Sequence, residues 1–209
     1  MSDKLNESHY FACPVYMVKK EEFVDAVGAV SDRYIASARP AGVNPPTLMT
    51  TDYSHEPELA EFSQYVSQTA WNILQAQGYA MDKLVTYFTE MWTQEHNAMS
   101  GMETHIHGMG AQVSAFFFLD VPADGCKLVI HDPRPAKVII NLPQADEGKI
   151  TPASNQIVFT PEVGTLILTN SWLPHSFTRN NSDKPVRFVH MNLSVSLAPV
   201  VEDPNVEVL

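Results

Sequence analysis

Cysteine, basic side chains and long apolar runs are all scarce in this sequence, and each shortage excludes a class of protein. Only 13 of the 209 residues are Lys or Arg, against 24 acidic residues. The formal net charge of −11 argues against a nucleic-acid or anionic-membrane partner, because phosphates select basic surfaces. No stretch approaches the roughly 18 consecutive apolar residues of a membrane span. The N-terminus lacks the apolar segment of a signal peptide, so we expect a cytoplasmic protein.

The two cysteines are too few for the disulfide framework of a small secreted domain. Cys13 and Cys126 both lie in apolar stretches, so we expect reduced thiols in the core. A disulfide that joins them is the alternative interpretation.

What the chain does have is enough apolar material for a sizeable core. Hydrophobic residues make up 44% of the sequence and charged residues 18%. The length fits one domain over residues 1–209. Within it we expect a mainly helical brace over 1–83, a β core over 84–195 and a loose tail over 196–209.

The local patterns change from helical to strand-like along the chain. Apolar residues recur with helical spacing over residues 20–37 and 56–77, whereas 38–53 has the composition of a loop. Residues 11–18 contain Pro14 and are at best an edge strand. Turn signals then separate about eight strand-like runs, at 84–92, 103–107, 113–121, 127–131, 138–141, 156–160, 165–170 and 186–195.

This order predicts a mainly β fold with α-helices: a double-stranded β-helix (jelly roll) core braced by N-terminal helices. Within the run 113–121, alternation makes Phe117 point to the side opposite Phe116 and Phe118. One side of that strand should therefore line the barrel and the other should pack on the helices.

Three histidines have the spacing of a metal site. His105 and His107 point to the same side of a predicted strand, and His175 follows Trp172-Leu173-Pro174 before a late strand. A single histidine is usually a surface or core residue, but this combination favours a divalent iron or manganese ion with open positions for substrate. We interpret His96, His131 and His190 as ordinary histidines.

Arg187 opens the last predicted strand between apolar neighbours. Its planar guanidinium matches a carboxylate with two parallel hydrogen bonds, which would suit an acidic ligand. An ordinary salt bridge to one of the acidic residues of the chain is the alternative.

Four segments together resemble a family of 2OG-Fe(II) oxygenases within the 2-oxoglutarate/Fe(II)-dependent dioxygenase superfamily. They are Thr104-His105-Ile106-His107, the strand 113–122 with its Ser-Ala-Phe start and closing Pro, His131-Asp132-Pro133-Arg134, and the run 164–175 that ends in Trp-Leu-Pro-His. The resemblance covers about residues 88–195. It implies Fe(II) as the metal and 2-oxoglutarate and O2 as cosubstrates, with release of succinate and CO2.

The resemblance also assigns residues, with one departure. It implies that His105 and His175 bind iron and that Arg187 pairs with the distal carboxylate of 2-oxoglutarate. His107 stands where most of the superfamily has an aspartate, so the third ligand stays open between His107, a carboxylate of Asp132 or Glu103, and a water or anion. The weaker candidates for substrate contacts are Trp92, Trp172 and Arg134.

The activity implied by the resemblance is that of a hydroxylase of a protein residue, such as proline, or of a small molecule. A cupin-like metal enzyme that does not use 2-oxoglutarate is one alternative, although residues 108–112 lack the glutamate usual there. A non-catalytic jelly-roll binding protein is the other. A homodimer is the default expectation for the assembly.

Overall fold

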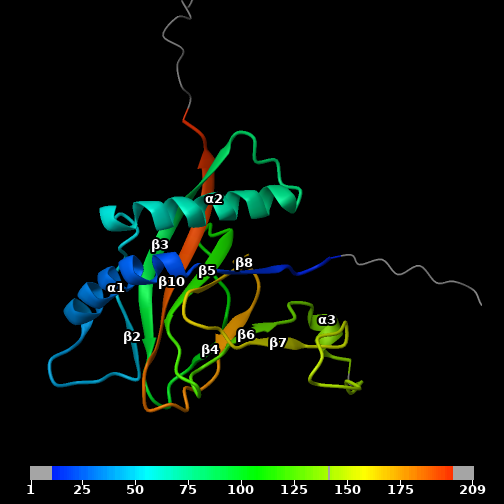
Figure 1. Ribbon diagram of the computed structural model, residues 1–209. Coiled ribbons are helices and arrows are strands. Elements are labelled where there is room, and N and C mark those ends of the chain that lie inside the picture. The colour runs from blue at the N-terminus through cyan, green and yellow to red at the C-terminus, as the bar shows by residue number, and fades with distance from the viewer. Residues whose placement is uncertain (1–10, 141, 200–209) are drawn as a thin grey trace, which may run out of the picture.

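The computed structural model describes residues 11–140 and 142–199, and two antiparallel sheets form its centre (Figure 1). The large sheet has the order β1-β8-β5-β10-β3-β2 and the small sheet the order β4-β9-β6-β7. The chain therefore has the predicted mainly β, jelly-roll fold. The bounds in the large sheet are β1 Val15–Lys19, β8 Thr165–Asn170, β5 Val113–Asp120, β10 Val186–Leu197, β3 Leu84–His96 and β2 Thr47–Met49. Those in the small sheet are β4 Met102–His105, β9 His175–Phe177, β6 Leu128–His131 and β7 Gln156–Phe159.

Two helices cover one face of the large sheet, as predicted (Figure 1). Helix α1 (Val24–Ala38) follows the short 3-10 turn η1 (Glu21–Phe23), and α2 (Ala60–Ala76) follows η2 (Pro57–Leu59). Proline in the first turn of the second helical segment costs no hydrogen bond, because the first N–H groups of a helix have no partner within it. The segment before β3 is not only a brace, because β1 and β2 complete the two edges of the large sheet.

Three local expectations were wrong. Of the strand predicted over 138–141, the described residues 138–140 do not form a strand, because Pro135 starts the short helix α3 (Pro135–Val138) instead. Strand β2 lies inside the predicted loop, and β9 was missed because three residues are too few to show a period. Most of the predicted tail lies outside the described residues, while β10 extends through Leu197.

The alternation along β5 divides the interior into two cores. Phe117 packs on Phe62 of α2, with ring centroids 5.0 Å apart. Phe116 and Phe118 point the other way, into an aromatic cluster between the sheets that includes Phe188. The predicted division of these phenylalanines between the helix layer and the barrel is thereby confirmed.

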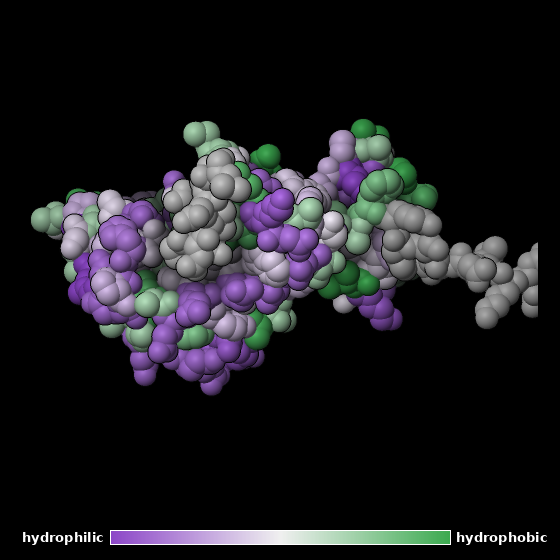
Figure 2. Space-filling model, turned by 90° about the horizontal axis from the view of Figure 1, so that it is seen from above, coloured by the Kyte–Doolittle hydropathy of each residue, from purple (hydrophilic) through white to green (hydrophobic). Residues whose placement is uncertain are grey.

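Three further features are the state of the cysteines, an exposed apolar region and the length of the helices. Cys13 and Cys126 are both free thiols. Apolar residues are visible at the end of the molecule that carries α3, where Val138, Ile139 and Ile140 are exposed (Figure 2). Within residues 11–140 and 142–199, no helix is both long and apolar enough to cross a membrane.

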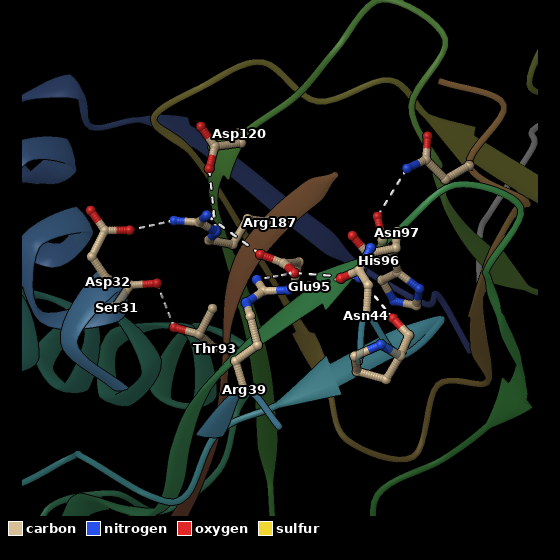
Figure 3. Close-up of polar contacts among 12 residues, drawn as sticks. Ser31, Asp32, Arg39, Asn44, Thr93, Glu95, His96, Asn97, Asp120 and Arg187 are labelled. Carbon is tan, nitrogen blue, oxygen red and sulfur yellow. Dashed lines mark hydrogen bonds and ion pairs between the residues drawn. The ribbon is translucent and has the colours of Figure 1, made fainter. Parts of the chain in front are cut away.

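A buried carboxylate ties the helix layer to the centre of the large sheet (Figure 3). Glu95 of β3 is 1% exposed and lies 2.6 Å from Arg39, just after α1, and 3.4 Å from Arg187 of β10. Arg187 also pairs with Asp32 of α1 and lies 3.4 Å from Asp120 of β5. A buried carboxylate must be paired, so these contacts hold α1, β3, β5 and β10 together.

We expect Arg187→Ala to lower the free energy of unfolding by about 3 kcal/mol, because it deprives a buried carboxylate of a partner. Denaturant unfolding measures the change. The matched control is Arg33→Ala, which removes a half-exposed arginine that pairs with the half-buried Glu56 and the exposed Glu58 and should have a much smaller effect. Equal, small effects of the two changes would contradict this assignment.

Candidate metal centre

His105, His107 and His175 meet at one end of the small sheet. His105 is the last residue of β4 and pairs directly with His175, the first residue of β9. His107 follows two residues later, where its backbone N–H donates to the carbonyl of Ser171. One ligand atom from each of the three side chains lies within 4.8 Å of the other two, a spacing that could hold a metal ion. The Nε2 atoms of His107 and His175 are 3.3 Å apart.

Burial keeps the inner histidines neutral. His175 is fully buried, and desolvation lowers its pKa to about 3. Desolvation, aided by the neighbouring His105, lowers the pKa of His107 to about 4. A neutral imidazole keeps the lone pair that a metal needs, so no proton has to be displaced at neutral pH.

Two of the three rings are already set for coordination through Nε2. The Nδ1 atom of His105 is 2.8 Å from the carbonyl oxygen of Glu103, and that of His175 is 3.1 Å from the carbonyl oxygen of Leu173. A carbonyl oxygen only accepts, so both Nδ1 atoms carry the proton. Both Nε2 atoms are then free to bind a metal.

His107 has a different partner. Its Nδ1 lies 3.2 Å from the amide nitrogen of Asn192, which also approaches the Glu90 carboxylate at 3.3 Å. The amide oxygen of Asn192 accepts from the Ser114 hydroxyl. With the amide held in this orientation, Nδ1 of His107 accepts and its proton sits on Nε2, facing His175. Coordination through that Nε2 requires the proton to move to Nδ1 and the amide to turn.

Neither carboxylate considered as an alternative ligand joins the histidines. Glu103 is exposed and reaches His105 only through its backbone, because the pairing of β4 with β9 is irregular between Met102 and His105. Asp132 turns back to bind Arg134 with two hydrogen bonds of 2.9 and 2.7 Å. Among the described residues, the group that could hold a metal therefore contains neither carboxylate.

Arg187 also lies away from the centre, contrary to the expectation of a cosubstrate anchor. Side chains alternate along β10, so Arg187 shares a face with Val189 on the helix side, whereas His190 and Asn192 face the histidines. Arg187 forms ion pairs with Asp32, Glu95 and Asp120. This matches the alternative interpretation, in which Arg187 forms a salt bridge within the chain. Among the described residues, no hydrogen bond or ring contact of the three histidines involves Lys or Arg.

The three weaker candidates lie at different distances from the centre. Trp92 is half-buried, and its ring centroid lies 6.5 Å from that of His107. Trp172 is 45% exposed in the connection between β8 and β9. Arg134 lines a separate cavity of about 310 Å³ with Cys13 and Asp132, and none of the three histidines borders it.

The sequence analysis missed three polar neighbours of the centre. The ring centroid of His190 lies 4.5 Å from that of His107, and Asn192 connects His107 to Glu90. A cavity of about 170 Å³ beside His107 is lined by Glu90 and Asn192 among others. His190, Asn192 and Ser194 are polar residues at every second position of the last strand. This period of two indicates a polar face on that strand and could have pointed to the missed residues.

The region around this centre resembles a known family. Residues 90–190, which include all three histidines, match the model of the family described as "Putative 2OG-Fe(II) oxygenase". The match covers just under half of the chain and supports a dioxygenase whose cofactors are Fe(II) and 2-oxoglutarate. No curated protein matches the sequence.

Solved structures share the fold at low sequence identity. A Pseudomonas putida prolyl-4-hydroxylase is 15% identical with a TM-score of 0.58, covering 87% of this chain and 92% of its own. A 2OG-Fe(II) oxygenase family oxidoreductase from Burkholderia pseudomallei is 13% identical with a TM-score of 0.58, covering 86% and 84%. HygX from Streptomyces hygroscopicus, solved with nickel, 2-oxoglutarate and hygromycin B, is 12% identical with a TM-score of 0.55, covering 87% and 83%.

We expect the stability of the metal-free protein to fall as the pH drops from about 6.5. The pKa values of His96 and His107 are about 4 and that of His175 about 3, all below the usual 6.5. The unfolded chain therefore binds protons first, so stability is full above the unfolded pKa and decreases as the pH falls towards the folded values. The loss should reach at least about 2 kcal/mol by about pH 4.5.

Denaturant unfolding at a series of pH values measures this loss. His96→Gln removes one titrating group away from the centre and should make the decrease less steep. A stability that stays constant across this pH range would contradict the neutral, buried state of these rings.

Proposed function

We propose that this chain is an Fe(II)/2-oxoglutarate-dependent hydroxylase of a peptidyl residue, such as proline, or of a small molecule. The observation that carries the proposal is the convergence of three imidazoles at the end of the small sheet. Two structural neighbours illustrate the two substrate classes. One is a prolyl-4-hydroxylase, and the other binds the small molecule hygromycin B. A cytoplasmic location and a homodimer stay predictions.

In this proposal His105, His107 and His175 hold the iron. Imidazole nitrogens suit divalent iron, and three protein ligands leave coordination positions for cosubstrate and oxygen. When bound, iron and 2-oxoglutarate supply the oxidative chemistry, which the protein positions and protects.

Neighbouring residues orient the histidine rings and exclude water from one side of the centre. The carbonyl oxygens of Glu103 and Leu173 fix the rings of His105 and His175. The ring of Phe116 packs against His175 with centroids 5.2 Å apart and closes the inner side of the centre to water.

Anaerobic addition of Fe(II) and 2-oxoglutarate to metal-free protein tests the proposal. We expect the visible charge-transfer band of the iron chelate in the wild type and its loss in His105→Ala and His175→Ala. Arg187→Ala is the matched control and should keep the band, because that arginine faces the helices. No band in the wild type would contradict the proposal and favour the cupin-like or non-catalytic alternative, and a band that survives both alanine changes would contradict the ligand assignment.

His107→Ala should weaken iron binding less than His175→Ala does, because His107 must first move its proton and turn the Asn192 amide. Asn192→Asp should strengthen iron binding by roughly tenfold, since a carboxylate accepts from Nδ1–H and leaves Nε2 free. Competition with a metal indicator measures the affinities, with Ser194→Ala on the same face of β10 as the control. Weaker binding by Asn192→Asp would contradict the tautomer inferred for His107.

A further inference from the structure

We propose that His190 and Trp92 donate hydrogen bonds to a carboxylate of the 2-oxo acid that binds at the His105–His107–His175 centre. The inference rests on the proposed function. It answers a question that the fold raises, because the arginine expected to bind this carboxylate points to the helices.

The first observation is that both side chains have a buried nitrogen without a partner. Across the described residues, five buried side-chain nitrogen or oxygen atoms lack a hydrogen bond, and two of them are Trp92 Nε1 and His190 Nε2. His190 is only 2% exposed. Buried polar groups in folded proteins are nearly always paired, so unpaired nitrogens on two neighbouring rings indicate a partner that binds from outside the chain.

The second observation is where these two nitrogens lie. Trp92 of β3 and His190 of β10 are directly opposite each other in the large sheet, and their ring centroids are 4.3 Å apart. The centroid of His190 lies 4.5 Å from that of His107 and 6.1 Å from that of His175. The pair therefore lies beside the candidate ligands, on the strands that face them across the barrel.

The chemistry of the two side chains defines the partner. An indole N–H only donates, so the hydrogen-bond partner that Trp92 lacks must be an acceptor. The imidazole of His190 can present an N–H to the same acceptor. Phe116, with its ring 4.6 Å from that of His190, gives neither side chain an oxygen.

A carboxylate is the acceptor that fits a molecule bound to this metal centre. Histidine ligands bring no negative charge to a metal, which favours an anionic ligand from outside the chain. A carboxylate oxygen accepts several hydrogen bonds, and in a site with little water, neutral N–H donors bind it strongly. No Lys or Arg of the described residues contacts the three rings, so these two donors would replace the usual cation.

Binding of 2-oxoglutarate to the Fe(II)-loaded protein under anaerobic conditions tests the inference. His190→Phe and Trp92→Phe keep an aromatic ring in place but remove the N–H, so each should weaken 2-oxoglutarate binding by roughly tenfold or more. The affinity for Fe(II) alone should stay within a few fold, which shows that the variants are folded. His190→Gln restores a donor and should recover part of the affinity. Ser63→Ala, which removes an unpaired hydroxyl on α2, is the matched control and should bind like the wild type.

Pyruvate, which lacks the distal carboxylate, distinguishes the two carboxylates of the cosubstrate. If the donors bind the distal one, His190→Phe weakens 2-oxoglutarate binding but not pyruvate binding. If they bind the one next to the ketone, both ligands lose affinity. Either pattern supports the inference. Unchanged 2-oxoglutarate binding in both phenylalanine variants overturns it while leaving the proposed function intact, and a wild type that binds no 2-oxoglutarate overturns both.

Discussion

The alternation of side chains along β10 is the constraint on which the candidate centre depends. This strand lies between β3 and β5, so its register is fixed from both sides. One set of alternate residues packs against the helices and contains Arg187, while the other set faces the small sheet and contains His190 and Asn192. A shift by one residue would exchange the two sets, which would place the arginine in the barrel and the histidine under α1.

The two faces of the large sheet have opposite electrostatic character. On the helix side, Glu95, Asp32 and Asp120 surround Arg187 in a cluster of full charges. On the barrel side, the groups next to the histidines are neutral rings and an amide. The charged cluster can exist because solvent reaches its edges. On the barrel side, burial lowers the pKa values of His175 and His190, so these two imidazoles are uncharged near neutral pH.

The sequence predicted the parts of this site that depend on local patterns. The spacing of His105 and His107 and the Pro before His175 predicted that the three rings lie together: β4 and β9 pair His105 with His175, and His107 is held by its backbone bond to Ser171 just after β4. The direction of Arg187 was missed because its type and apolar neighbours suit either face, and only the pairing with β3 and β5 distinguishes them. His190 was dismissed for a related reason: a histidine beside a metal centre and one in an ordinary core have the same local sequence.

The replacement of a carboxylate by His107 changes what the centre can bind. An aspartate ligand would neutralise part of the metal charge, whereas a set of histidine ligands would leave that neutralisation to molecules from outside the chain. The Glu90 carboxylate and the Nδ1 atom of His107 both approach the amide nitrogen of Asn192. A metal held by these histidines would favour an anion by charge, and two unpaired nitrogens, on Trp92 and His190, could hydrogen-bond it. A 2-oxo acid satisfies both conditions at once, because one end can neutralise the metal and its carboxylate oxygens can accept from the rings.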